Sequence, residues 1–246
     1  MSNYIFADLK RIIKRIPFLI SILLINLALA GVLLFAHGSN WNSVYFVICV
    51  QNFSQVLPII LGLIVLSAVF ADDFKAKTMQ VAIGTGLSRG AVIFSKLIEV
   101  CVLTAFSIFT IGVVAFGMGG ILHAETIASQ NIEIIQFLLK AGSAIIGYCS
   151  IAMILMFFTQ TTGFATLFYI GLSAHIVEGI LEIFTDIKYI QVLNLKRFFF
   201  SSLVETVFTR MLLGTIDVGG IIGMIIYIIG AVAIALLLFR KRELEF

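Results

Sequence analysis

Long apolar runs alternate with short polar stretches along the chain, and this alternation predicts its elements. Six runs approach or exceed the roughly 20 residues that a helix needs to cross the hydrocarbon core of a membrane. The runs are continuously apolar rather than alternating, which argues against a membrane β-barrel. We therefore predict an all-α polytopic membrane protein, a single transmembrane domain over residues 1–246. Its expected spans are Ile16–Ala36, Val44–Phe70, Ala91–Leu122, Ile134–Phe158, Thr162–Phe184 and Ile221–Phe239.

The composition supports a membrane location. The 246 residues are 61% hydrophobic and 12% charged, and the mean hydropathy is +1.16, whereas soluble domains carry about 25% charged residues. The cysteines Cys49, Cys101 and Cys149 fall inside predicted spans, where a thiol packs as a small apolar group. Their spacing predicts neither a disulfide framework nor a metal site.

The distribution of basic residues predicts the orientation in the membrane. Six spans place both termini on one side, which is expected to be cytoplasmic because Lys and Arg accumulate there. The net charge of +3 fits contact with anionic lipid, and no motif predicts a nucleic-acid partner. The basic residues on the expected cytoplasmic side are Lys10, Arg11, Lys14, Arg15, Lys75, Lys77, Arg89, Lys96, Arg240, Lys241 and Arg242.

The segment before the first span has the pattern of an amphipathic helix. Between Ile5 and Ile16 the apolar positions follow helical spacing, and four basic residues take the opposite face. Such a helix, within residues 1–15, is suited to the lipid headgroup plane. Pro17 stands where the chain would turn into the membrane. The alternative is a plain basic flank that only sets topology.

A charged island, defined as Ala71–Lys96, separates the second and third predicted spans. Apolar and charged residues are interleaved in its first half, Gly84 and Gly86 interrupt it, and Ser88 can cap the next helix. We expect it to be a cytoplasmic loop, over residues 71–90, that docks on a soluble partner. Its glycine-rich stretch lacks the spacing of a phosphate-binding loop. A solvated loop that only sets topology is the alternative.

The island also carries a family resemblance. It holds an acidic residue at Asp72 or Asp73, then Gly84-Thr85, Ser88-Arg89 and Lys96. With the amphipathic N-terminal helix and six spans, this arrangement resembles the permease subunits of ATP-binding-cassette exporters of the type-2 class. Two details differ, because the family usually has Glu at the acidic position and often Pro where Leu87 stands here.

The resemblance implies that the island is a coupling helix. It implies as partners a separate cytoplasmic ATPase and a second permease subunit, identical or similar, in a membrane whose lipid the chain contacts. This chain would bind no cofactor, and ATP and Mg would be held by the ATPase. Small permeases of this form resemble bacterial plasma-membrane exporters of bacteriocins, lantibiotics or other membrane-active antibiotics. The expected coupling residues are Asp72, Asp73, Phe74, Lys75, Lys77, Thr78, Gly84, Thr85, Ser88 and Arg89.

Polar residues inside the spans are candidates for a substrate path or a dimer interface, since they are costly in hydrocarbon. Gln51, Asn52 and Gln55 could instead be hydrogen-bonding contacts between helices. His175, Glu178 and Glu182 share one face of the fifth span, facing a vestibule or the second subunit. The same groups could serve a proton- or ion-coupled carrier or, with further ligands, an intramembrane metal hydrolase. A scaffold without transport activity is a third alternative.

Two further expectations concern the outer side. Lys140 follows Glu133 by two turns of the fourth span, so we expect a snorkelling lysine that can pair with Glu133. The connection over residues 185–220 mixes aromatic and charged residues, and is too apolar for a free aqueous loop. It predicts amphipathic half-helices that dip into the outer leaflet or cap the dimer.

Overall fold

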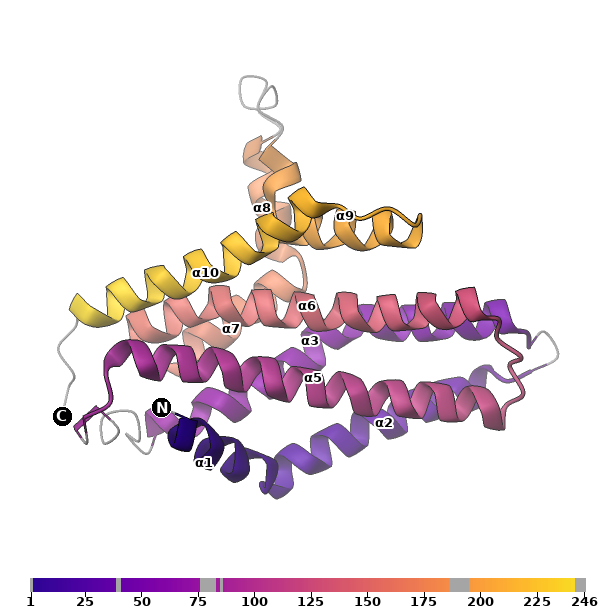
Figure 1. Ribbon diagram of the computed structural model, residues 1–246, viewed down its shortest axis with the longest axis horizontal. Helices are drawn as coiled ribbons and strands as arrows, with labels where there is room; N and C mark the ends of the chain where they lie inside the picture. The colour runs from indigo at the N-terminus through magenta and orange to yellow at the C-terminus, as the bar shows by residue number, and fades with distance from the viewer. Residues whose placement is uncertain (1, 39–40, 76–82, 85, 186–194, 242–246) are drawn as a thin grey trace.

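The computed structural model describes residues 2–38, 41–75, 83–84, 86–185 and 195–241, and in these ranges the chain forms helices and turns without a strand. The helices pack side by side into an elongated bundle (Figure 1). Their bounds are α1 Ser2–Ile13, α2 Ile16–Ala36, α3 Ser43–Lys75, α5 Arg89–Ile121, α6 Ala128–Thr159, α7 Thr162–Ser173, α8 Ile176–Thr185, η2 Leu195–Phe198, α9 Phe200–Leu212 and α10 Val218–Lys241.

Five of the described helices, α2, α3, α5, α6 and α10, are long and apolar enough to cross a membrane. The prediction of an α-helical polytopic membrane protein is therefore confirmed in outline. The predicted span Thr162–Phe184 is not one continuous helix. The chain bends by 69° between α7 and α8, where His175 has a left-handed φ of 58°. A sixth span therefore requires that the bent pair α7–α8 cross as one unit.

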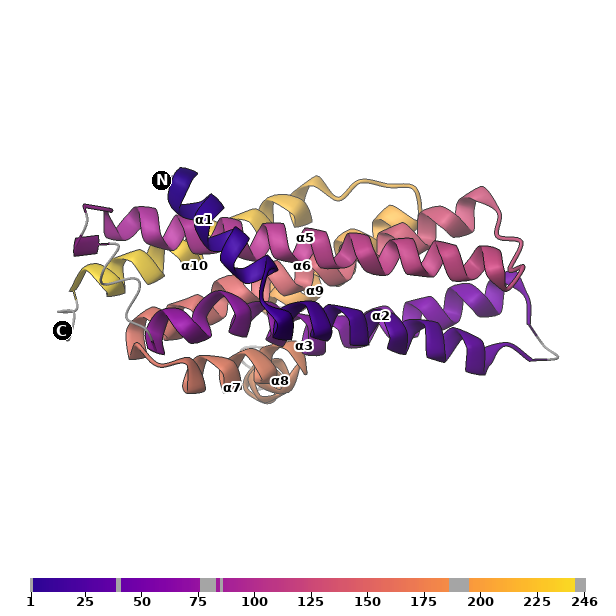
Figure 2. The ribbon, with the colours of Figure 1, turned by 90° about the horizontal axis from the view of Figure 1, so that it is seen from below.

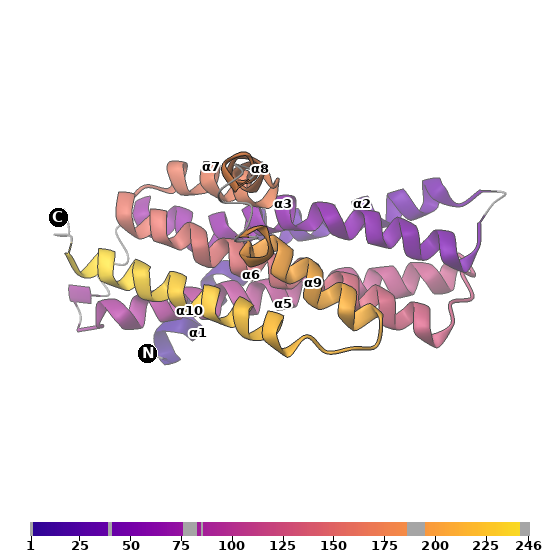
Figure 3. The ribbon, with the colours of Figure 1, turned by 90° about the horizontal axis from the view of Figure 1, so that it is seen from above.

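Helix α6 lies at the centre of the bundle and packs against α3, α5, α7, α9 and α10. Figure 2 shows α1 crossing over α5, and Figure 3 shows α9 lying along α6, with α7 and α8 beside it. The start of α1, the end of α3, the start of α5 and the end of α10 gather at one end of the molecule (Figures 1 and 2). The charged island therefore leaves and re-enters the bundle at the end that holds α1 and the end of α10.

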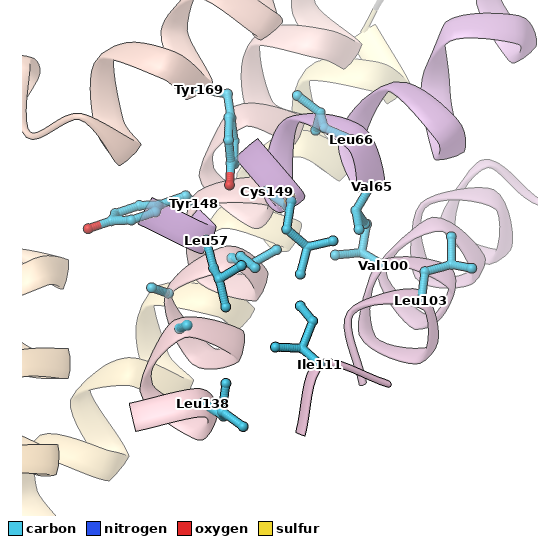
Figure 4. Packing of buried hydrophobic residues seen from close by; sticks show 14 of the residues in the cluster. Leu57, Val65, Leu66, Val100, Leu103, Ile111, Leu138, Tyr148, Cys149 and Tyr169 are labelled. Atoms are coloured by element: carbon cyan, nitrogen blue, oxygen red, sulfur yellow. The ribbon is translucent and has the colours of Figure 1, made fainter. Parts of the chain in front are cut away.

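The core is built from aliphatic side chains of α3, α5 and α6, including Leu66, Leu103 and Leu138 (Figure 4). Tyr169 of α7 enters this core and donates a 2.5 Å hydrogen bond to the carbonyl oxygen of Pro58 in α3. A Cβ at Gly62, one turn further along α3, would lie 1.6 Å from the Tyr169 hydroxyl oxygen. Glycine at position 62 is what allows α7 to approach α3 this closely.

The N-terminal segment folds as expected, as a short helix followed by a turn into α2. Pro17 lies in the first turn of α2, where its missing N–H has no intrahelical partner to lose. One edge of α1 faces protein rather than lipid, because Ile12 is fully buried and Asp8 is 8% exposed. Phe6 and Lys10 remain exposed on the opposite edge. The amphipathic helix is therefore a packed part of the bundle.

The connection over residues 185–220 contains the helix α9, which lies against α6 and α10. Phe200 at its start is buried in a socket on α6, where a Cβ at Gly147 would lie 1.9 Å from the Phe200 ring. Tyr227 of α10 donates a 2.5 Å hydrogen bond to the carbonyl oxygen of Phe198. These contacts show that the described part of this connection is a structured element of the bundle.

Candidate functional site

A cavity of about 510 Å³ opens between α3, α6, the end of α7 and the start of α9. We call it the inner cavity. Its volume falls within the range of about 300–1,000 Å³ that is typical of ligand sites. Its wall is lined by Gln51, Ser54, Gln55, Pro58, Ile59, Phe137, Lys140, Ala141, Ala144, Tyr148, Ser173, Ala174, His175, Ser201, Val204 and Glu205.

The structure brings together some of the predicted polar residues and separates others. Gln51 and Gln55 line the inner cavity together with His175, although more than 100 positions separate α3 from the α7–α8 bend. Asn52 is exposed and is not among the lining residues, because one step along a helix turns a side chain by about 100°. Asn52 therefore does not share this cavity with the two glutamines, and its place on a substrate path or a dimer interface stays a prediction.

An ion pair closes the α9 side of the inner cavity. Lys140 of α6 pairs with Glu205 of α9, whose side chain is 62% exposed. Lys140 thus has its partner across the cavity, 65 positions away, and the expected pairing with Glu133 is wrong. Because α9 packs along α6, Glu205 lies closer to Lys140 than Glu133 does, which is two turns away on α6.

The bend between α7 and α8 is held by His175 and Glu178. The Nδ1 atom of His175 lies 2.7 Å from a carboxylate oxygen of Glu178, and the other oxygen accepts a 3.4 Å hydrogen bond from the backbone N–H of Ser201 in α9. His175 therefore orients a carboxylate that reaches α9. The predicted alignment of His175 and Glu178 is confirmed as a direct contact.

A second cavity, the outer cavity, lies beside the first and has a volume of about 520 Å³. Glu178 and Glu182 line only this cavity, whereas His175, Ser201 and Glu205 line both. The outer cavity is rich in carboxylates and hydroxyls, while the inner one combines amide, hydroxyl and aromatic groups. Together they form one polar region of the bundle.

Tyr148 of α6 places a hydroxyl group at the wall of the inner cavity. Its side chain is 2% exposed, and its ring packs edge-on against His175 and Phe200, with centroids 6.4 Å and 5.5 Å away. Its hydroxyl points away from the apolar cluster (Figure 4). No hydrogen-bond partner for this hydroxyl lies within the described parts of the chain. The hydroxyl is therefore free to bond to a ligand in the cavity that Tyr148 lines.

The metal-hydrolase alternative needs a set of ligands. In the ranges that the structure describes, no group of three or more His, Cys, Asp or Glu residues is placed to hold a metal ion.

Sequence inspection missed the roles of Tyr148, Ser201 and Glu205, which become neighbours of the glutamines only through helix packing. No local pattern marks such contacts.

At the other end of the bundle, the structure describes only part of the predicted coupling segment. Lys77, Thr78 and Thr85 lie outside the described residues, as do the side chains of Asp72, Asp73, Phe74 and Lys75, whose backbone ends α3. Gly84 is exposed and Gly86 has a φ of 100°. Ser88 caps α5 by accepting a 3.2 Å hydrogen bond from Ala91 N–H, as predicted.

Arg89 has a partner that the sequence did not indicate. Its guanidinium donates hydrogen bonds of 2.6 Å and 3.2 Å to the carbonyl oxygens of Phe239 and Arg240, and lies 5.4 Å from the Phe239 ring centroid. The last carbonyls of a helix lack intrahelical donors, so Arg89 caps the end of α10. Arg89 thereby joins the start of α5, directly after the island, to the C-terminal helix.

Lys96 forms a buried ionic cluster at the same end. It is fully buried and donates to Asp8 of α1 at 2.5 Å and to Glu99 of α5 at 2.9 Å, with Arg11 paired to Asp8. A lysine in an apolar run with a glutamate three positions later could have signalled a buried pair. Its inter-helix partner Asp8 could not be read from the sequence.

Comparison with known proteins adds no identification. No protein-family model matches the chain, and no curated protein matches it either.

Proposed function

We propose that this chain is the transmembrane permease subunit of a type-2 ATP-binding-cassette exporter. In this proposal a separate cytoplasmic ATPase supplies the energy, and two permease subunits, identical or similar, form the transport unit. The chain would lie in a bacterial plasma membrane with both termini in the cytoplasm, moving an amphipathic substrate such as a peptide antibiotic, a bacteriocin or lantibiotic, or a lipid-like molecule.

One observation carries the proposal: four helices are tied together where the charged island leaves and re-enters the bundle. Lys96 links α5 to α1 through Asp8 and lies 3.4 Å from the Val69 carbonyl oxygen of α3, and Arg89 links α5 to α10. A partner that pushed on the island would therefore move the ends of all four helices as a unit. The resemblance of Gly84-Thr85, Ser88-Arg89 and Lys96 to the coupling segment of the family supports this reading.

The polar cavities support a transport role. Gln51, Gln55 and His175 line a space inside a bundle whose outer surface is mostly apolar. Polar side chains at membrane depth are costly, and they usually mark the path of a substrate or ion.

A proton-coupled carrier is the second candidate, favoured by a different observation. The ion pairs His175–Glu178 and Lys140–Glu205 both lie at the wall shared by the two cavities. Titratable pairs beside a polar cavity can carry protons through a membrane protein.

Transport in inverted membrane vesicles that contain the chain separates the two candidates. Uptake of fluorescent amphipathic peptides is measured with ATP after an ionophore has collapsed all ion gradients, and with a proton gradient in the absence of ATP. The exporter predicts uptake only with ATP, and vesicles without the chain serve as the control. Uptake driven by the gradient alone would replace the exporter with the carrier.

A further inference from the structure

We infer that the inner cavity binds an amphipathic organic cation, with Glu205 as the acceptor of its ammonium group. Calling this ligand a transport substrate rests on the proposed function, whereas the binding itself does not. Glu205 has no assigned role beyond its pairing with Lys140.

Polar groups without a protein partner make the inner cavity suitable for a ligand with hydrogen-bonding capacity. Tyr148, Gln51 and Gln55 all line it, and neither the Tyr148 hydroxyl nor the two side-chain amides have a hydrogen-bond partner in the described ranges. Ser54 is different, because its hydroxyl donates a 2.7 Å hydrogen bond to the Gln51 carbonyl oxygen. The free donors and acceptors thus lie on both α3 and α6, on either side of the cavity.

The charges of the two adjoining cavities, taken together, favour a cation. Glu205 lines both cavities and Glu178 and Glu182 line the outer one, against Lys140 in the inner cavity and His175 in both. His175 is already committed to Glu178. Glu205 keeps 62% of its side chain exposed while it binds Lys140, so a ligand ammonium can reach it.

The rest of the wall suits an apolar body. Phe137, Ile59, Pro58, Val204 and the Tyr148 ring surround the polar groups. A cavity of about 510 Å³ holds a small amphiphile or one cationic segment of a larger molecule. The ligand class is therefore a compact cation with an attached aromatic or aliphatic group.

Occupancy would also change the structure around the cavity. A ligand ammonium on Glu205 competes directly with Lys140, because both are cations seeking the same carboxylate. Displacing Lys140 removes the ion pair between α6 and α9, while the Gly147–Phe200 socket still holds the start of α9 and a 3.3 Å hydrogen bond from Gln136 to the Met211 carbonyl oxygen holds its end. Binding is thereby coupled to the packing of the middle of α9 on α6.

The test uses three dansyl probes and the full-length chain purified in detergent. Dansylcadaverine carries a primary ammonium, dansylamide has no charge, and dansylglycine is an anion. We expect saturable binding of dansylcadaverine with an affinity about tenfold or more above that of the other two, since a charge-assisted hydrogen bond is worth that factor. Equal binding of all three probes would mean partitioning into apolar surface, and tighter binding of dansylglycine would mean an anion site. Either result overturns the inference.

Two substitutions should change dansylcadaverine binding in opposite directions. Glu205→Gln should weaken dansylcadaverine binding about tenfold, whereas Lys140→Gln should strengthen it by removing the competing cation. Glu133→Gln removes a carboxylate from α6 outside the cavity lining, and should leave binding unchanged. Weaker binding in Lys140→Gln, or an unaltered Glu205→Gln variant, contradicts the assignment.

A conservative variant covers the case in which the charge variants fail to fold. Tyr148→Phe keeps the ring and removes only the unpartnered hydroxyl, so it should retain the thermal stability of the native chain and bind dansylcadaverine several-fold more weakly. Unaltered binding would remove Tyr148 from the site and contradict the inference. Binding by the purified chain without any ATPase separates this test from that of the proposed function, because either can fail while the other stands.

Discussion

Lys96 on α5 donates a 2.5 Å hydrogen bond to Asp8 on α1, across 88 positions of sequence. Lys96 is fully buried, and its second carboxylate, Glu99, lies one turn further along α5. The ring of Tyr4, also on α1, has its centroid 5.9 Å from the Lys96 ammonium. The N-terminal helix is therefore fastened to the bundle by a buried charge rather than by lipid contact alone.

Asp8→Asn should release α1 from α5. Removing one partner of a buried pair costs about 3 kcal/mol or more because the remaining charge stays desolvated. A cysteine placed at Ile12, which is fully buried, should then react with a maleimide at a higher rate. Lys10→Gln is the control, since it removes a charge from the exposed edge of α1, opposite Asp8. Equal thiol protection in the two backgrounds would show that Asp8 does not fasten α1.

Gly62→Ala should lower the melting temperature of the purified protein. The added methyl would overlap the Tyr169 hydroxyl, and overpacking of this kind costs about 1–3 kcal/mol. Combining it with Tyr169→Phe should recover only part of the loss, because the ring carbon that bears the hydroxyl lies 2.6 Å from the same Cβ position. A melting temperature equal to that of the native chain would contradict the close approach of α7 to α3.

Two glycines of α6 should respond in opposite ways to the same substitution. Gly147→Ala places a methyl in the Phe200 ring, so it should displace α9 and destabilise the fold. Gly142→Ala meets only ordinary contacts, with Ile108 at 3.4 Å, and should be neutral or stabilising by up to roughly 1 kcal/mol, because Gly weakens helix interiors. Thermal unfolding of the two variants tests the placement of α9. Similar stabilities for both would be inconsistent with the socket.

Arg89→Gln should loosen the end of α10. The guanidinium that bonds the carbonyls of Phe239 and Arg240 is lost, so amide hydrogen exchange in the last turn of α10 should speed up. Exchange in the first turn of α10, far from Arg89 along the helix, provides the internal control. Unchanged protection at the end of α10 would mean that the cap does not stabilise that helix.

Hydropathy predicted the long helices well, because composition over about 20 residues is enough to identify them. The predicted Ile16–Ala36 span has the bounds of α2, and Ser88 caps α5 as its position before an apolar run suggested. The break at His175 escaped notice because apolar residues continue on both sides of it. A bend set by one left-handed residue leaves little trace in a hydropathy average.

The candidate site was predicted only in part. Gln51, Gln55, His175 and Glu178 stood out because polar groups are conspicuous in apolar runs, and the structure places them around two adjoining cavities. Glu205 lies in a segment that is already polar, and Tyr148 looks like an ordinary core aromatic. Their roles depend on how α9 packs on α6, which is decided by tertiary contacts rather than by local pattern.

Coupling to a separate ATPase is the central proposal, and Gly84 offers the most direct test of it. A Cβ at Gly84 would meet nothing within 4 Å, so Gly84→Ala serves as a matched control for Gly84→Pro, which also restricts the backbone of the island. The tagged, full-length chain is purified from its native membrane, and the measurement is the ATPase activity that stays in constant ratio to the amount of chain. We expect such activity with the native chain and with Gly84→Ala, and its loss with Gly84→Pro at equal membrane insertion. ATP hydrolysis that is absent from the native preparation, or equal in all three, would contradict the proposed coupling.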